Sequence, residues 1–346
     1  MATDDILTVE HLKAYYLMHY FGITREVRAV DDITMSVRRN EVYGIAGESS
    51  SGKTSFIRVL AAAIRPPLRV VGGSARYAFD DRSIDVASAG PDATEAIRWS
   101  HLSYIMQGSM SVLNPVRRIE RSFEDFAARP LGLSGKPLHR RFVEHLGRLK
   151  LPPEVLRAYP HELSGGMRQR VTIGLATIAN PQFIIADEPT TALDVVVQKD
   201  VLSLIRDLQK QMGASVIFVT HDMAVHANMA DRVGIVYAGR LVEEAPTRQL
   251  FTAPKHPYTA HLVASLPRIG DTTQRPALEG RPPNLADPPQ GCRFHPRCPL
   301  AIEKCRQEVP PLMTVAPDQR SACWRWDEVV PLPGSIPAAR IPEPVR

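Results

Sequence analysis

Residues 41–64 join a short apolar run to an amphipathic run through a loop of glycine and small polar residues. The apolar run, EVYGIA at 41–46, predicts a buried strand. The second run predicts a helix, because its apolar residues recur at helical spacing up to a Pro-Pro pair: Phe56, Ile57, Leu60 and Ile64. The loop, GESSSGKT at 47–54, has the pattern Gly, four residues, Gly-Lys-Thr, which lets backbone N–H groups surround phosphate. This order predicts a nucleotide-binding α/β domain.

The loop residues themselves carry the expected phosphate chemistry. We expect Lys53 to reach the β- and γ-phosphates of ATP and the Thr54 hydroxyl to ligate Mg²⁺. The other residues expected to contact the nucleotide here are Gly47, Glu48, Ser49, Ser50, Ser51, Gly52 and Ser55. Ser50 is unusual, because glycine at this place would accept a positive φ without steric cost. We expect it to alter the affinity slightly and to leave function intact.

Strands and helices alternate again further along the chain. The runs 183–186 and 216–220 read as short buried strands, with a helix between them that carries Val201, Leu204, Ile205 and Leu208. Such alternation predicts a parallel sheet with helices on both faces. Between about 108 and 180 strand signals vanish and helical patterns dominate, which predicts a helical insertion.

Composition excludes several classes of protein. A formal charge of +5 over 346 residues steers anionic partners only weakly, so nucleic acid is not an expected partner. The N-terminus, MATDDILTVEH, lacks the basic and apolar regions of a signal peptide, and the apolar stretches are shorter than the roughly 18 residues of a spanning helix. We therefore expect folding in the cytosol. There, clustered cysteines indicate metal in preference to disulfides: Cys292, Cys298, Cys305 and Cys323.

Two further segments identify a family resemblance. Residues 163–170 read LSGGMRQR, and residues 183–189 read FIIADEP. The sequence here resembles an ABC-family nucleotide-binding domain, whose signature and Walker B strand these segments match. The likeness spans about residues 5–265 and adds three marks in the family's order: Gln107 in YIMQGSMSVLNP, Asp194 at the end of TALD, and His221 in VIFVTHD.

The resemblance implies an architecture. It is a P-loop NTPase of the ABC type at 1–255, with an antiparallel β subdomain and a helical subdomain at about 108–180. A cysteine-containing extension at 256–326 and a proline-rich tail at 327–346, expected to be flexible, would follow.

The chemistry of the side chains expected at the strand ends agrees with the roles that the resemblance implies for them. Asp187, leaving a dry strand, can hold the hydration shell of Mg²⁺. Glu188 would lie near the γ-phosphate, where a carboxylate can polarise or deprotonate the attacking water. His221 could contact the γ-phosphate and hold the transition state in place, and Gln107 would orient metal and water. Catalysis is thus expected from Glu188, His221, Gln107 and Lys53, and Mg²⁺ binding from Thr54, Gln107 and Asp187.

The signature segment has a separate expected task. Ser164 followed by Gly165 and Gly166 opens a helix with nothing bulky in front of its N-terminus. In the family this end binds the γ-phosphate of ATP held by the opposite subunit, so two chains would sandwich two nucleotides. Asp194 is counted with these nucleotide-binding residues. For the adenine ring, alignment of LKAYY selects Tyr16 among several nearby aromatic residues.

The C-terminal segment indicates the transporter subtype. Residues 256–326 resemble the extension of ATPases that serve oligopeptide, dipeptide, nickel and some oligosaccharide importers. The four cysteines are separated by five, six and seventeen residues, without the close pair usual in zinc sites. The resemblance implies an iron–sulfur cluster of the 4Fe–4S type. Zinc and unliganded thiols remain alternatives.

The implied function is ATP hydrolysis that powers import of peptides, with oligosaccharides or nickel as alternative cargo and a soluble, non-transport ABC ATPase as the more distant alternative. The implied partners are a second ATPase subunit, usually a paralogue, two integral-membrane permease subunits and an extracytoplasmic substrate-binding protein. The chain would lie at the cytoplasmic face of the plasma (inner) membrane. Its helical insertion, basic between Arg117 and Lys150, and the segment after Gln107 would receive the permease.

Overall fold

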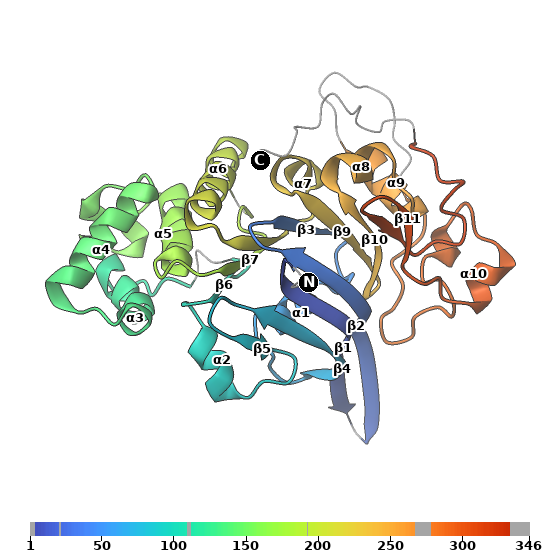
Figure 1. Cartoon of the computed structure of the whole chain (residues 1–346), viewed down its shortest axis with the longest axis horizontal. Coiled ribbons are helices and arrows are strands. Elements are labelled where there is room, and N and C mark those ends of the chain that lie inside the picture. The colour runs from blue at the N-terminus through green and yellow to red at the C-terminus, as the bar shows by residue number, and fades with distance from the viewer. Residues whose placement is uncertain (1–3, 21, 109–111, 192, 267–277, 333–346) are drawn as a thin grey trace.

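The computed structural model describes residues 4–20, 22–108, 112–191, 193–266 and 278–332. Its described residues form two sheets, with helices between and around them (Figure 1). This arrangement confirms the predicted α/β class.

The larger sheet has eight described strands in the order β11-β12-β10-β9-β3-β8-β7-β6. These strands are β3 (Val42–Ala46), β6 (Leu102–Ile105), β7 (Phe183–Asp187), β8 (Ser215–Val219), β9 (Arg232–Tyr237), β10 (Arg240–Pro246), β11 (Met313–Ala316) and β12 (Gln319–Ser321). Neighbouring strands from β9 to β6 run parallel, and those from β9 to β11 run antiparallel. β3, β7 and β8 are buried at every position, as continuous apolar runs with helices on both faces require.

The smaller sheet is antiparallel, in the order β2-β1-β4-β5. Its strands are β1 (Asp5–Tyr20), β2 (Ile23–Arg38), β4 (Leu68–Ala78) and β5 (Ser83–Asp85). Helix α1 (Lys53–Leu60) contacts β1, β2 and β4 of this sheet and β7 of the larger one. One apolar cluster therefore joins both sheets around α1, which fixes the start of that helix in space.

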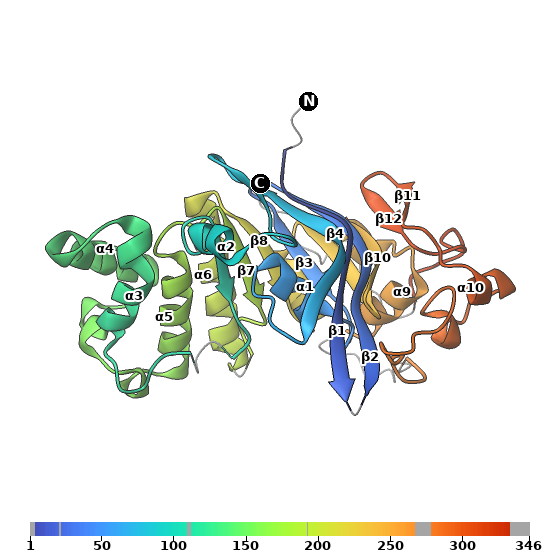
Figure 2. The same cartoon turned by 90° about the horizontal axis from the view of Figure 1, so that it is seen from below.

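Helices form a lobe at one end of the molecule, beyond β6 and β7 (Figures 1 and 2). They are α3 (Ile119–Leu131), α4 (Gly135–Arg148), the short 3₁₀ turns Pro153–Arg157 and Pro160–Glu162, α5 (Gly165–Thr177) and α6 (Val195–Met212), with α2 (Pro91–Ile97) nearby. Helix α6 buries Val201, Leu204, Ile205 and Leu208, the face that its periodicity predicts. Helix α1 is shorter than expected, because it ends at Leu60 and Ala62 follows with a φ of 51°.

The C-terminal residues lie at the opposite end (Figures 1 and 2). Here α8 (Thr247–Thr252), α9 (Pro257–Ala264), a 3₁₀ turn (His295–Arg297) and α10 (Glu303–Gln307) follow β10 along the chain, and residues of α8, α9 and the loop before the 3₁₀ turn pack against β9 and β10. Helix α7 (Met223–Met229) lies nearer the middle of the molecule, where it contacts β3 and α8 (Figure 1). The hairpin of β11 and β12 pairs with β10 and so extends the larger sheet. Most of the expected proline-rich tail, 333–346, lies outside the described residues.

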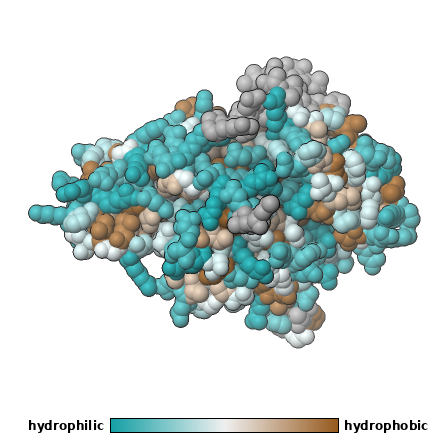
Figure 3. Space-filling model, viewed as in Figure 1, coloured by the Kyte–Doolittle hydropathy of each residue, from teal (hydrophilic) through white to brown (hydrophobic). Residues whose placement is uncertain are grey.

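The surface in the view of Figure 3 is mostly hydrophilic. Within the described part of the chain, no helix is long and apolar enough to cross a membrane.

Candidate functional site

The loop between β3 and α1 is shaped by backbone that few residue types adopt. Gly47 and Gly52 have φ values of 145° and 101°, and a Cβ at Gly52 would come within 1.9 Å of the Ala29 carbonyl oxygen. Glycine is therefore required at both places. Ser50 adopts a φ of 64°, so it occupies the conformation for which glycine would have no steric cost.

Lys53 is buried at the start of α1 and folds back over the loop. Its Nζ donates to the backbone oxygens of Gly47 and Glu48, both at 2.7 Å, and to Ser51 Oγ at 3.3 Å. Burial lowers the pKa of Lys53 to about 8, against the attraction of nearby carboxylates. Because these three acceptors are neutral, the ammonium charge remains available to an anion in the loop.

Two carboxylates stand at the end of β7, across from Lys53. Asp187 is the last residue of the strand, and burial raises its pKa to about 6, although Tyr104 donates a hydrogen bond of 3.3 Å to Oδ2. Glu188 follows with a φ of 46°. Such backbone is costly for a non-glycine residue, and it directs Glu188 out of the strand.

Three side chains hold the Glu188 carboxylate. Gln107 Nε2 and Thr191 Oγ1 donate to Oε2 at 3.0 and 2.9 Å, and His221 Nδ1 lies 3.2 Å from Oε1. Gln107 follows β6 and His221 follows β8, so three parallel strands deliver this group to one edge of the sheet. A carboxylate oriented in this way can accept a proton from a water bound beside it.

A cavity of about 320 Å³ unites most of the expected nucleotide residues. Its lining includes Tyr16, the loop residues Ser49, Ser50, Ser51, Gly52, Lys53, Thr54 and Ser55, and Gln107, Glu188 and His221. Tyr16 Oη lies 3.0 Å from Ser55 Oγ, which places that tyrosine beside the loop. Tyr15 instead donates to Asp31 at 2.5 Å.

The signature residues lie elsewhere. Ser164 caps α5 by accepting from the Met167 N–H at 3.3 Å, and a Cβ on the following Gly165 would meet open space. A Cβ on Gly166 would approach the Val197 side chain to 2.9 Å. Asp194 caps α6 and accepts from the backbone N–H of Val196 and Val197. None of Ser164, Gly165, Gly166 and Asp194 is in the lining of the cavity that holds Lys53.

Residues of the C-terminal segment contact the loop, which the sequence did not suggest. Leu285 is in the lining of the same cavity, and its carbonyl oxygen accepts from the Arg28 N–H of β2 at 2.9 Å. The Glu48 N–H donates to Tyr258 Oη of α9 at 2.7 Å. Arg297 forms an ion pair with the Glu48 carboxylate. Motif reading could not find these residues, because each lies more than 200 positions from its partner.

The four cysteines line one small cavity with His256, His295 and Trp324 among its other residues. Burial raises the pKa of Cys292, of Cys298 to about 11 and of Cys323 to about 12, and the mutual proximity of the thiols adds to these shifts. Within the described ranges, no group of three or more His, Cys, Asp or Glu side chains is arranged to hold a metal ion. Neither an iron–sulfur cluster nor zinc is therefore confirmed.

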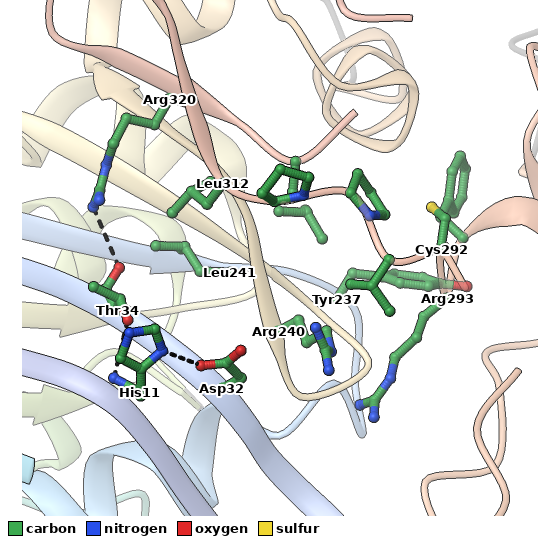
Figure 4. A pocket seen from close by; sticks show the side chains of 16 residues that line it. His11, Asp32, Thr34, Tyr237, Arg240, Leu241, Cys292, Arg293, Leu312 and Arg320 are labelled. Carbon is green, nitrogen blue, oxygen red and sulfur yellow. Dashed lines mark hydrogen bonds and ion pairs between the residues drawn. The ribbon is translucent and has the colours of Figure 1, made fainter. Parts of the chain in front are cut away.

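A further cavity, of about 550 Å³, lies between the antiparallel sheet and the C-terminal segment (Figure 4). Carboxylates accompany its cationic side chains: Arg293 and Arg240 pair with Asp31, Arg320 with Glu244 and His11 with Asp32. Its charges are thus balanced within the protein, and we assign no anion to it.

Two family models match the chain. The model described as ABC transporter matches residues 30–191, and the one described as oligopeptide/dipeptide transporter, C-terminal region, matches residues 242–305. Among relatives, a putative peptide import ATP-binding protein of Brucella abortus (strain 2308) is 39% identical over 342 residues, which cover 95% of this chain and 99% of that protein. The dipeptide transport ATP-binding protein DppD of Caldanaerobacter subterraneus subsp. tengcongensis is 37% identical, with 94% and 99% covered.

A solved structure shares the fold. It is a dimeric ATP-binding cassette in a post-hydrolysis state with ADP and Pi. It aligns with a TM-score of 0.59 and 24% identity, over 70% of this chain and 98% of the cassette. The likeness confirms the predicted cassette fold.

Proposed function

This chain belongs to the ABC transporter family, and we propose that it is the ATP-hydrolysing subunit that drives import of peptides. The observation that carries the hydrolytic part is the Glu188 carboxylate, held by Gln107, Thr191 and His221 beside the loop of Lys53. The peptide part rests on relatives named for peptide and dipeptide import, which match along almost the whole chain.

In this proposal Lys53 and the loop N–H groups bind the phosphates. Thr54, Gln107 and Asp187 bind Mg²⁺, either directly or through its water molecules. Glu188 accepts a proton from the attacking water, and His221 contacts the γ-phosphate. Tyr16 packs against adenine. The contact of Tyr16 with Ser55 and the position of Asp187 behind Glu188 support these roles.

The signature residues would act on a second nucleotide. We propose that Ser164, Gly165 and Gly166 of one subunit, with Asp194, complete the ATP site of a partner ATPase, usually a paralogue. The open space beside Gly165 at the start of α5 supports this assignment. So do Val195 and Val196 beside Asp194, which are 81% and 73% exposed and would be covered in a dimer.

We propose that two integral-membrane permease subunits hold the chain at the cytoplasmic face of the membrane, and that an extracytoplasmic binding protein supplies the peptide. Val112 and Val116, which follow Gln107, are 45% and 79% exposed. Apolar side chains at this place support docking of the permease there.

For the cysteines we propose a 4Fe–4S cluster, with zinc as the alternative. Its support is the convergence of all four thiols on one cavity. Iron and acid-labile sulfide in anaerobically purified protein would be the supporting result, and their absence would contradict the cluster.

The proposed function is tested in the complete transporter with its binding protein. Peptide uptake into vesicles should require ATP, and Glu188→Gln should lower hydrolysis by about 10²–10⁴-fold while ATP still binds. Hydrolysis at the parental rate in that variant would refute the role of Glu188. Uptake of nickel or an oligosaccharide without peptide would refute the cargo.

A further inference from the structure

An arginine of the C-terminal segment contacts the phosphate loop directly. Arg297 lies between Cys292 and Cys298, in the 3₁₀ turn that lines the cysteine cavity. Its guanidinium binds the Glu48 carboxylate at two points, Nη1 to Oε2 at 2.8 Å and Nη2 to Oε1 at 3.1 Å. The Arg297 side chain is only 6% exposed and that of Glu48 25%. A paired contact of this kind fixes both position and orientation.

Glu48 is also held through its backbone. Its carbonyl oxygen accepts from Lys53 Nζ, and its N–H donates to Tyr258 Oη, both at 2.7 Å. Four groups therefore bond to residue 48: Arg297 and Tyr258 come from beyond residue 256, and the others are Lys53, expected to bind phosphate, and the Ser51 N–H of the loop itself, at 3.3 Å. Glu48 therefore links Arg297 to Lys53, so a change in its contact with Arg297 can alter the position of Lys53.

The Arg297 guanidinium contacts a cluster of buried aromatic side chains. It lies 5.9 Å from the centre of the Tyr237 ring and donates to Tyr237 Oη at 3.3 Å. Tyr237, Tyr258 and Phe294 contact one another, with ring centres 4.6 to 5.5 Å apart, and all three are at most 1% exposed. Phe294 belongs to the same cysteine-bearing loop as Arg297, so this aromatic cluster fixes that loop against β9 and α9.

The ion pair of Arg297 with Glu48 also changes the charge beside the phosphate loop. The Glu48 carboxylate is close enough to Lys53 to act on its charge, so it would also repel a phosphate in the loop. Arg297 supplies the compensating positive charge. Without it, a carboxylate with no partner of its own would remain beside the site of a polyanion.

We propose that Arg297 is a positioning residue that sets the ATP affinity of the phosphate loop by neutralising and orienting Glu48. The inference rests on the proposed function, since it takes ATP as the ligand of this loop. Arg297 does not touch the reacting atoms. Its effect therefore appears in ATP binding and in the KM for ATP, while kcat in the transporter stays within about twofold.

Three variants of the full chain test the proposal by equilibrium binding of Mg²⁺–ATP. Arg297→Ala exposes the phosphates to an unpaired carboxylate and should weaken binding about 10-fold. Glu48→Gln leaves the arginine charge uncompensated and should strengthen binding about 3-fold. The double variant lacks both charges of the ion pair, so its affinity for Mg²⁺–ATP should lie within about 3-fold of the parent's. Opposite effects from the two partners of one ion pair are not expected of a merely structural contact.

Arg306→Ala is the matched control. Arg306 also neighbours a cysteine, Cys305, but its side chain is 62% exposed and pairs with Glu303 of its own helix. Its removal should leave ATP binding unchanged. If Arg297→Ala fails to fold in a thermal unfolding assay, Arg297→Lys replaces it, alone and with Glu48→Gln. Lysine keeps the charge but not the two-point contact, so we expect a loss of about 3-fold, again recovered by the second change.

Parental affinity in Arg297→Ala, or in Arg297→Lys where that variant replaces it, would overturn the proposal. An equal loss in the arginine variant and its double variant would do so as well. A parent chain that binds no ATP would instead refute the proposed function, and with it this inference.

Discussion

The substitution Asp187→Asn should stabilise the nucleotide-free protein at neutral pH, although it removes a proposed Mg²⁺ ligand. Asp187 is 1% exposed at the end of β7, and burial raises its pKa from 3.8 to about 6. The hydrogen bond from Tyr104 acts in the opposite direction without reversing the shift. Asparagine can still accept that bond through its amide oxygen, and it has no charge to keep out of water.

The sign follows from proton binding. Between about pH 4 and pH 6 the folded state holds a proton on Asp187 that the unfolded state has lost, so the stability due to this group falls as pH rises through that window. Above that pH range the raised pKa of Asp187, about 6 instead of 3.8, lowers the free energy of unfolding by about 3 kcal/mol, at 1.36 kcal/mol per pKa unit. Asp187→Asn should therefore raise the free energy of unfolding by up to about 3 kcal/mol at about pH 7.5, and by only about 1 kcal/mol at about pH 4.5.

Urea unfolding of the full chain without nucleotide or Mg²⁺ measures both values. The difference between variant and parent is needed because burial also raises the pKa of Glu243 to about 7, and that group titrates in both proteins. Asp207→Asn is the control, since its carboxylate is 54% exposed in an ion pair with Lys150 and should matter little. A variant no more stable than the parent at about pH 7.5, or equally more stable at both pH values, would refute the reasoning.

Three other substitutions have definite expected outcomes. Ser50→Gly relieves a left-handed backbone and should raise the free energy of unfolding by about 1 kcal/mol in thermal unfolding; a loss of stability would show that the Ser50 side chain makes a favourable contact. Arg232→Met leaves the buried Glu41 carboxylate without its cation, while Glu244 keeps Arg320, so urea unfolding should show a loss of about 3 kcal/mol; a neutral result would mean that water reaches Glu41. Tyr16→Leu should weaken ATP binding about 5- to 10-fold through loss of a stacking surface, and unchanged affinity in a binding titration would place adenine elsewhere.

The sequence allowed prediction of what is encoded locally. The strand, loop and helix around Lys53 are adjacent in the chain, so periodicity and glycine spacing were enough to predict them. Asp187 and Glu188 were placed correctly at a strand end because FIIADEP carries both the buried run and the charges that stop it. The family resemblance implied that Glu188 and His221 lie at the γ-phosphate and that Gln107 orients metal and water. Their contacts with Glu188 were not predicted, and the parallel order of β6, β7 and β8 gives the physical reason that they lie together.

Contacts between distant segments could not be predicted in this way. Arg297 and Glu48 are 249 positions apart, and nothing in either neighbourhood signals the other. The pairing of β12 with β10 is of the same kind, because a three-residue strand has too short a pattern to show periodicity. The early end of α1 reflects packing at Ala61 and Ala62, where tertiary contacts override a helical pattern that continues to Ile64.

The ion pair of Glu48 explains why the loop can hold an acidic residue at all. Lys53 and Asp187 are both buried, and burial shifts the pKa of each toward its neutral form, so phosphate and Mg²⁺ would each relieve a cost already present in the empty site. Glu48 differs, because its charge is of the wrong sign for a phosphate and no bound nucleotide could relieve it. Compensation must therefore come from the protein, and Arg297 supplies it from the C-terminal segment. A cassette with this loop but without that segment should bind ATP more weakly unless residue 48 is also neutral.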